Sequence, residues 1–275
     1  MTLSTIRNNP AKQKKVKTKK QKAIAATCAV AFWLLVWHVV SLCVGSELVL
    51  VSPVKVVQTL FTVLFDPDFL KTVWYSAARI LGGFFTALTL GTVLGWVASR
   101  FWVVETLLRP ITAVIKATPV ASFIILVLLW FSGKNLSVII SMLMVFPVIY
   151  MNVLEGIRSA DEKLLEMAQV FRLSVGKKLL YISLPAVAPF FVSACSVSLG
   201  LCWKSGIAAE VIGTPDGSIG AVFYQAKIFL QTSELLAWTV VVVAVSVAFE
   251  KLFMFLLRLV LKKLKMEDVL NGKRA

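Results

Sequence analysis

The sequence predicts an all-α membrane protein with about six transmembrane helices. Of its 275 residues, 59% are hydrophobic and only 16% are charged, whereas soluble domains carry about 25% charged residues. The mean hydropathy is +0.86, and the apolar residues gather in runs long enough to cross a hydrocarbon core of about 30 Å. These observations favour a chain that crosses a membrane several times.

Six apolar runs of spanning length follow one another along the chain. A helix rises about 1.5 Å per residue, so about 20 residues cross the core. The predicted spans are 23–44, 78–99, 113–132, 136–153, 187–208 and 236–258. Only the short turn 132–135 separates the third span from the fourth, so these two helices are expected to run antiparallel.

The predicted spans divide the chain into five parts. The parts are a basic tail at 1–22, a first transmembrane helix at 23–44, an extracytoplasmic loop at 45–72, a core of five helices at 73–258 and a second basic tail at 259–275. In the extracytoplasmic loop, Ser52 is a candidate N-cap and Pro53 suits a first helical position, so an interfacial helix is expected there. A second short helix is expected from Asp68, leading into the next span.

Basic residues are concentrated on one side of this predicted topology. The tail 1–22 carries eight Lys and Arg residues and no acidic residue, and cytoplasmic loops are enriched in Lys and Arg. With this tail in the cytoplasm, the segments 100–112, 154–186 and 259–275 also lie there. The acidic residues expected outside are Glu47, Asp66, Asp68, Glu210, Asp216 and Glu234. Both termini are therefore expected in the cytoplasm, with the basic tails against anionic lipid rather than nucleic acid.

The residues needed for common catalytic or metal sites are missing from the sequence. The four cysteines form no C-x-x-C pair and no cluster with histidine, and His38, the one histidine, lies in the first predicted span. No G-x-x-x-x-G-K-[ST] motif occurs. This chain is therefore expected to be no enzyme, to hydrolyse no ATP and to bind no cofactor.

The charged loop 154–186 is the most informative segment. Ser159 and Glu162 fit a capping box, which predicts that a helix starts there, and Ser174 is a candidate cap for a second helix that Pro185 ends. The apolar residues expected on one face of the first helix are Leu164, Leu165, Met167, Ala168 and Phe171. Such a helical knob fits two interpretations, a docking surface for another protein or a helix pair lying on lipid.

The spacing in this loop resembles the EAA loop of permease subunits of ABC importers. That pattern is Glu-Ala-Ala, three residues, Gly, nine residues and Ile-x-Leu-Pro. The matching residues are Glu166, Ala168, Ile182, Leu184 and Pro185. Met167 replaces the middle Ala and Arg172 replaces the Gly. Together with the topology, the segments 79–82, 118–119 and 209–210 extend the likeness to about 200 residues and make it similar to the nitrate, sulfonate and taurine branch.

The resemblance implies a type I ABC importer transmembrane fold and several partners. The expected partners are a cytoplasmic ATP-binding cassette subunit, an extracytoplasmic solute-binding protein and a second copy of this chain in a bacterial cell membrane. The residues implied to couple this chain to the ATPase are Glu166, Ala168, Phe171, Arg172, Gly176, Ile182, Leu184 and Pro185. The transported solute is expected to be a small anion.

Arg172 leaves one geometric question open. The family glycine would permit a turn with positive φ between the two loop helices. With Arg172 in its place, either the turn forms without positive φ or Gly176 relaxes it half a turn later.

Lys204 is the clear candidate for a charge within a predicted span. Such residues often mark transport pathways or proton relays. Lys204 either extends toward the membrane surface or faces a pathway, where a cation would suit an anionic solute. An ion-coupled secondary carrier or channel remains the alternative function, although one lysine is a narrow basis for an ion relay.

Overall fold

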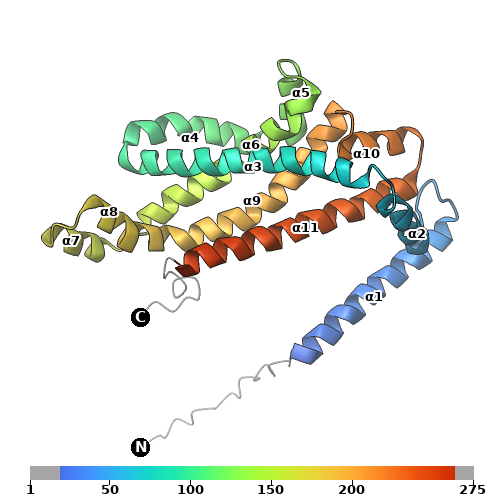
Figure 1. Cartoon of the computed structure of the whole chain (residues 1–275), viewed down its shortest axis with the longest axis horizontal. Coiled ribbons are helices and arrows are strands. Elements are labelled where there is room, and N and C mark those ends of the chain that lie inside the picture. Colours follow the sequence, from blue (N-terminus) through green and yellow to red (C-terminus); the bar gives the residue numbers. More distant parts are fainter. Residues whose placement is uncertain (1–18, 264–275) are drawn as a thin grey trace, which may run out of the picture. The chain divides into compact units, whose positions relative to one another are not determined.

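The computed structural model describes residues 19–263, and in this range the chain forms helices and no strand (Figure 1). The chain divides into two compact units, Met1–Lys55 and Val56–Ala275. Residues 1–18 and 264–275, which hold most of the two predicted basic tails, lie outside the described residues.

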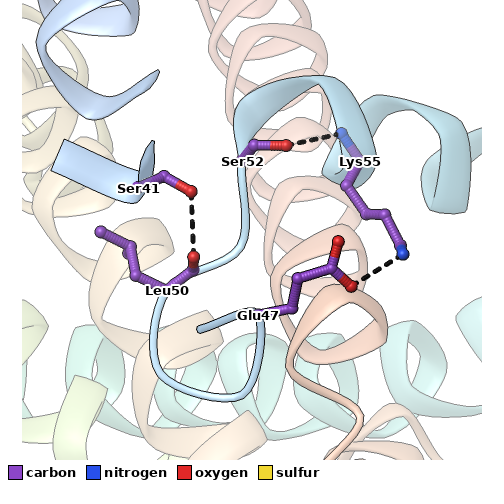
Figure 2. Close-up of polar contacts among 5 residues, drawn as sticks. All are labelled: Ser41, Glu47, Leu50, Ser52 and Lys55. Atoms are coloured by element: carbon purple, nitrogen blue, oxygen red, sulfur yellow. Dashed lines mark hydrogen bonds and ion pairs between the residues drawn. The ribbon is translucent and has the colours of Figure 1, made fainter. Parts of the chain in front are cut away.

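The first unit contains helix α1 (Lys19–Val44) and a segment that folds back against its end. Ser41 Oγ donates a hydrogen bond to the Leu50 carbonyl at 3.0 Å, and Lys55 Nζ lies 2.8 Å from Glu47 Oε2, as Figure 2 shows. Ser52 Oγ accepts a bond from the Lys55 amide at 3.3 Å, directly before α2 (Pro53–Leu64) begins. The structure therefore has the Ser52 cap and the first-position proline that the sequence predicts.

The second unit is built on four long helices. They are α3 (Phe69–Arg100), α6 (Gly133–Arg158), α9 (Leu184–Gly213) and α11 (Thr232–Lys263). Fully buried side chains of α3, α6 and α9 meet in the main core, among them Phe84, Ile149 and Trp203. The separate helix predicted from Asp68 is instead the first part of α3, which is continuous through residue 100.

Small residues allow α3 and α6 to approach each other closely. Gly83, Gly91 and Gly95 of α3 face α6, and a Cβ added at Gly83 would overlap the Val138 carbonyl. At Gly91 the added Cβ would lie 3.0 Å from Ile149. Close packing through small residues is a main source of helix association in membranes, where lipid weakens the hydrophobic driving force.

The third predicted span, 113–132, does not form one straight helix. α4 (Trp102–Ala117) and α5 (Val120–Leu128) meet at an angle of 106°, and α5 turns away from α4 in Figure 1. Pro119 explains the break, because a proline disfavours helical backbone at the residue before it. Thr118 has extended angles of φ −83° and ψ 133°. Five described helices are long and apolar enough to span a membrane, or six if this bent pair counts as one.

The segment before α9 also differs from the prediction. Pro185 does not end a helix, because α8 (Val175–Lys178) continues through a π-helix, η1 (Leu179–Ser183), directly into α9. The Leu184 amide donates to the Leu179 carbonyl five residues earlier. A proline lacks the amide that would bond four residues back, which accounts for a wider turn here. Two shorter helices complete the unit, α7 (Glu162–Val170) and α10 (Ile219–Ile228).

Candidate functional site

Helix α7 forms the exposed part of the predicted loop and begins at an aspartate cap. Asp161 is the N-cap, and its Oδ1 accepts a bond from the Lys163 amide at 2.9 Å. The capping box predicted from Ser159 is therefore wrong, since Ser159 Oγ donates to the Gly156 carbonyl at 2.9 Å. A carboxylate at this position also interacts favourably with the positive end of the helix.

The end of α7 is a Schellman turn centred on Arg172. Arg172 has φ 47°, its amide donates to Gln169 O at 3.0 Å, and the Leu173 amide donates to Ala168 O at 2.9 Å. These are the two hydrogen bonds of that motif. Both alternatives offered by the sequence are wrong. The turn does have a positive φ, at Arg172 itself, and Gly176 lies inside α8 with an ordinary helical φ. Arg172 adopts the conformation that glycine would adopt more easily.

The inner side of α7 packs on the start of α9. Ala168 is 3% exposed and Ile182 is 6% exposed, and they form a buried cluster with Ala160 and Ala186. Leu173 packs against the same cluster. The sequence placed Ala168 on the presumed docking face, and the structure places it on the opposite side. Its small side chain thus holds α7 close to the membrane helix.

The outer side of α7 exposes a group of apolar side chains, named here the α7 outer face. Leu164, Met167, Val170 and Phe171 form it, and Val170 and Phe171 are 78% and 71% exposed. Glu166 and Arg172 are exposed on the same short helix and turn. Contiguous exposed apolar residues often mark a protein or membrane contact.

The remaining predicted coupling residues differ in their exposure. Gly176 is exposed, whereas Leu184 and Pro185 are half-buried at the start of α9.

The loop is attached to two of the long helices. α7 and α8 lie together where α6 ends and α9 begins (Figure 1). Only residues 159–161 separate α6 from α7, and Arg158 at the end of α6 forms an ion pair with Glu105 of α4. A displacement of α7 would therefore act directly on α6 and α9.

A second polar site lies at the opposite end of α9, around a glutamate that the sequence analysis named but did not predict to be buried. The sequence placed Glu210 in an outer loop, but it lies within α9 and is fully buried. Ser76 Oγ donates to Glu210 Oε2 at 2.7 Å, and Gly220 N donates to the same oxygen at 3.4 Å. The Ile219 amide donates to Ser76 Oγ at 2.9 Å. The carboxylate thus joins α3, α9 and the first turn of α10.

Lys204 is exposed on α9. It makes no ion pair with a carboxylate of residues 19–263. This exposure is consistent with both predicted alternatives, a lysine that extends toward the membrane surface and a lysine that faces a pathway.

The helices, the EAA-type spacing and the loop between α6 and α9 define a membrane-spanning permease subunit. The model of the family described as "Binding-protein-dependent transport system inner membrane component" matches residues 87–266. The chain belongs to this family, which confirms the resemblance carried by the loop. Members of the family are permease subunits of ABC importers and are not catalytic.

Three curated relatives align with most of the chain. An aliphatic sulfonates transport permease of Bacillus subtilis (strain 168) is 29% identical over 216 residues, 78% of each chain. The taurine transport system permease of Escherichia coli (strain K12) is 27% identical over 220 residues, 78% of this chain and 80% of its own. The nitrate import permease of Synechocystis sp. (strain PCC 6803) is 25% identical over 214 residues, 74% and 76% of the two chains.

Proposed function

We propose that this chain forms the translocation pathway of an ATP-driven importer for a small anion. The carrying observation is the α7 outer face, an exposed apolar surface on a helix attached directly to α6 and α9. The names of the aligned relatives support the solute class, because sulfonates, taurine and nitrate each carry a sulfonate or nitrate group.

In this proposal the α7 outer face sits in a groove of a separate cytoplasmic ATPase subunit. The Asp161 cap, the Arg172 turn and the cluster around Ala168 hold α7 against the membrane helices. ATP-dependent closure of two ATPase subunits would then move α7 as a rigid body and displace α6 and α9. Small rigid-body movements of packed helices are a common way to switch between two states. Here the two states would open the pathway alternately to each side.

The proposed assembly contains two copies of this chain in a bacterial cell membrane. The pathway lies between the copies, two ATPase subunits bind inside, and a solute-binding protein delivers the anion outside. Both termini lie in the cytoplasm, as the placement of Lys and Arg in the sequence favours.

The test is uptake by proteoliposomes that contain the permease, its ATPase and its binding protein. A further relative is named a bicarbonate transport system permease, so bicarbonate is tested as well. Uptake of labelled taurine, ethanesulfonate, nitrate or bicarbonate is expected when ATP is supplied to the ATPase and no ion gradient is present. Uptake that persists without ATP and follows an ion gradient would contradict the proposal and support the ion-coupled carrier or channel.

A further inference from the structure

A cavity lies between helices α4, α5, α6 and α9. Its volume is about 530 Å³, within the range of about 300–1,000 Å³ typical of small-molecule sites. Most of its walls are apolar, as at Val120, Pro147 and Leu201. Its polar lining residues are Lys116, Thr118 and Asn152, and none of the described residues that line it is acidic.

Within the described residues 19–263, Lys116 is the one charged residue of this lining, and its side chain is exposed. Its Nζ lies 3.4 Å from the thioether sulfur of Met151, which is a weak acceptor. Within residues 19–263, Lys116 forms no ion pair with a carboxylate. A lysine could stabilise the last turn of α4 through the helix dipole, yet here the ammonium reaches Met151 of α6. A cation among membrane helices without a counter-charge is a candidate for anion binding.

Asn152 is the lining side chain that keeps a spare donor, because the Thr118 hydroxyl already donates to Val114 O at 2.8 Å. Asn152 Nδ2 donates one hydrogen bond to Val148 O at 2.8 Å, and an amide nitrogen carries a second N–H. Val120 starts α5, and since the amides of Ser122 and Phe123 already bond to Pro119 O, the amides of this turn without an intrahelical acceptor are those of Val120 and Ala121. The positive end of α5 therefore begins at the cavity wall, at the break between α4 and α5. Membrane transporters commonly bind anions at the N-terminus of a broken helix.

We propose that this cavity binds the transported anion, with Lys116 neutralising its charge and Asn152 donating to one of its oxygens. This rests on the proposed function and adds the binding residues to it. Lys116 takes the role that the sequence suggested for Lys204. Lys204 does not line the cavity, whereas Leu201, one turn earlier on α9, does.

The first test measures protection of Lys116 in the unmodified complex. The permease and its ATPase, in lipid nanodiscs, react with acetic anhydride, and mass spectrometry reports acetylation of Lys116 and of Lys251, an exposed lysine of α11. Millimolar ethanesulfonate, nitrate or bicarbonate is expected to slow acetylation of Lys116 at least about threefold and to leave Lys251 unchanged. The proposal is overturned if none of the three anions protects Lys116, or if neutral ethyl methyl sulfone protects it equally.

The second test uses anion uptake per ATP hydrolysed. Lys116→Gln is expected to lower this ratio about tenfold, as for loss of one contact to a charged group, while Lys116→Arg retains most of it and Lys251→Gln is unchanged. If the Lys116→Gln permease takes up as much anion per ATP as the unmodified permease, the cavity is not the anion site, and the proposed function is unaffected. Absence of ATP-dependent uptake by the unmodified complex contradicts the proposed function instead, and the protection experiment still decides whether the cavity binds anions.

Discussion

Arg172 carries a local backbone cost that a single substitution can remove. A left-handed conformation costs a residue with a side chain about 1–2 kcal/mol, and Arg172 has φ 47° at the end of α7. Arg172→Gly is therefore expected to stabilise the α7 turn by about 1 kcal/mol. Slower amide hydrogen exchange of residues 162–173 in the Arg172→Gly variant would show this stabilisation. Gly176→Ala is the control, because Gly176 is helical with no atom within 4 Å of an added Cβ. Faster exchange in Arg172→Gly would mean that the arginine side chain holds the turn.

Glu210 is expected to stabilise the fold through its hydrogen bonds. Glu210→Ala removes the acceptor for Ser76 and Gly220 and leaves a cavity, which should cost about 2–4 kcal/mol. Glu210→Gln keeps a carbonyl oxygen at the same place, so its thermal unfolding midpoint should lie much nearer the parent. Asp216→Ala, an exposed position in the turn after α9, is the control. Equal losses in the Gln and Ala variants would show that the negative charge itself is required.

At the scale of helices, the contact between α3 and α6 depends on glycine at one of two adjacent positions. A Cβ at Gly83 would overlap Val138 O and lie 2.8 Å from Ser141 Cβ, whereas a Cβ at Gly82 meets nothing within 4 Å. Gly83→Ala should therefore force the helices apart and cost about 1–3 kcal/mol. Gly82→Ala should be neutral or slightly stabilising. Unfolding in mixed micelles measures both variants, and equal midpoints would contradict the close packing.

The two sides of α7 are expected to respond differently to substitution. Phe171→Asp places a charge on the α7 outer face, so co-purification of the ATPase should fall at least about tenfold, with an unchanged unfolding midpoint. Ala168→Leu overfills the buried cluster, and the midpoint itself should fall. Lys163→Gln, exposed at the start of α7, is the control for both. An ATPase that still binds the Phe171→Asp permease would show that this face is not the docking surface.

Sequence alone could predict the elements whose signals are local. The apolar runs and the EAA-type spacing each depend on residues close together in the chain. The structure has a helix at each apolar run except 113–132, where α4 and α5 form a bent pair, and a loop at the EAA-type spacing. The start of α7 was predicted wrongly at Ser159, because aspartate two residues later is an equally good cap and only the folded turn selects Asp161. The inward position of Ala168 and the burial of Glu210 depend on helices distant in sequence, so no local pattern could reveal them.

For the whole molecule, the bent pair α4–α5 decides on which side of the membrane the termini lie. With five spans the termini would lie on opposite sides, and with six they lie on the same side. The helices α3 and α6 run parallel, because Gly83 faces Val138 and Gly95, further along α3, faces Val153. The end of α3 and the start of α6, which α4 and α5 connect, therefore lie on opposite sides, and we expect the pair to cross as one broken span. Green fluorescent protein fused to either terminus should then fluoresce, and alkaline phosphatase fused after Asp66 should be active as the extracytoplasmic control. A fluorescent N-terminal fusion with a dark C-terminal one would identify α4–α5 as a re-entrant loop and exclude the six-span topology.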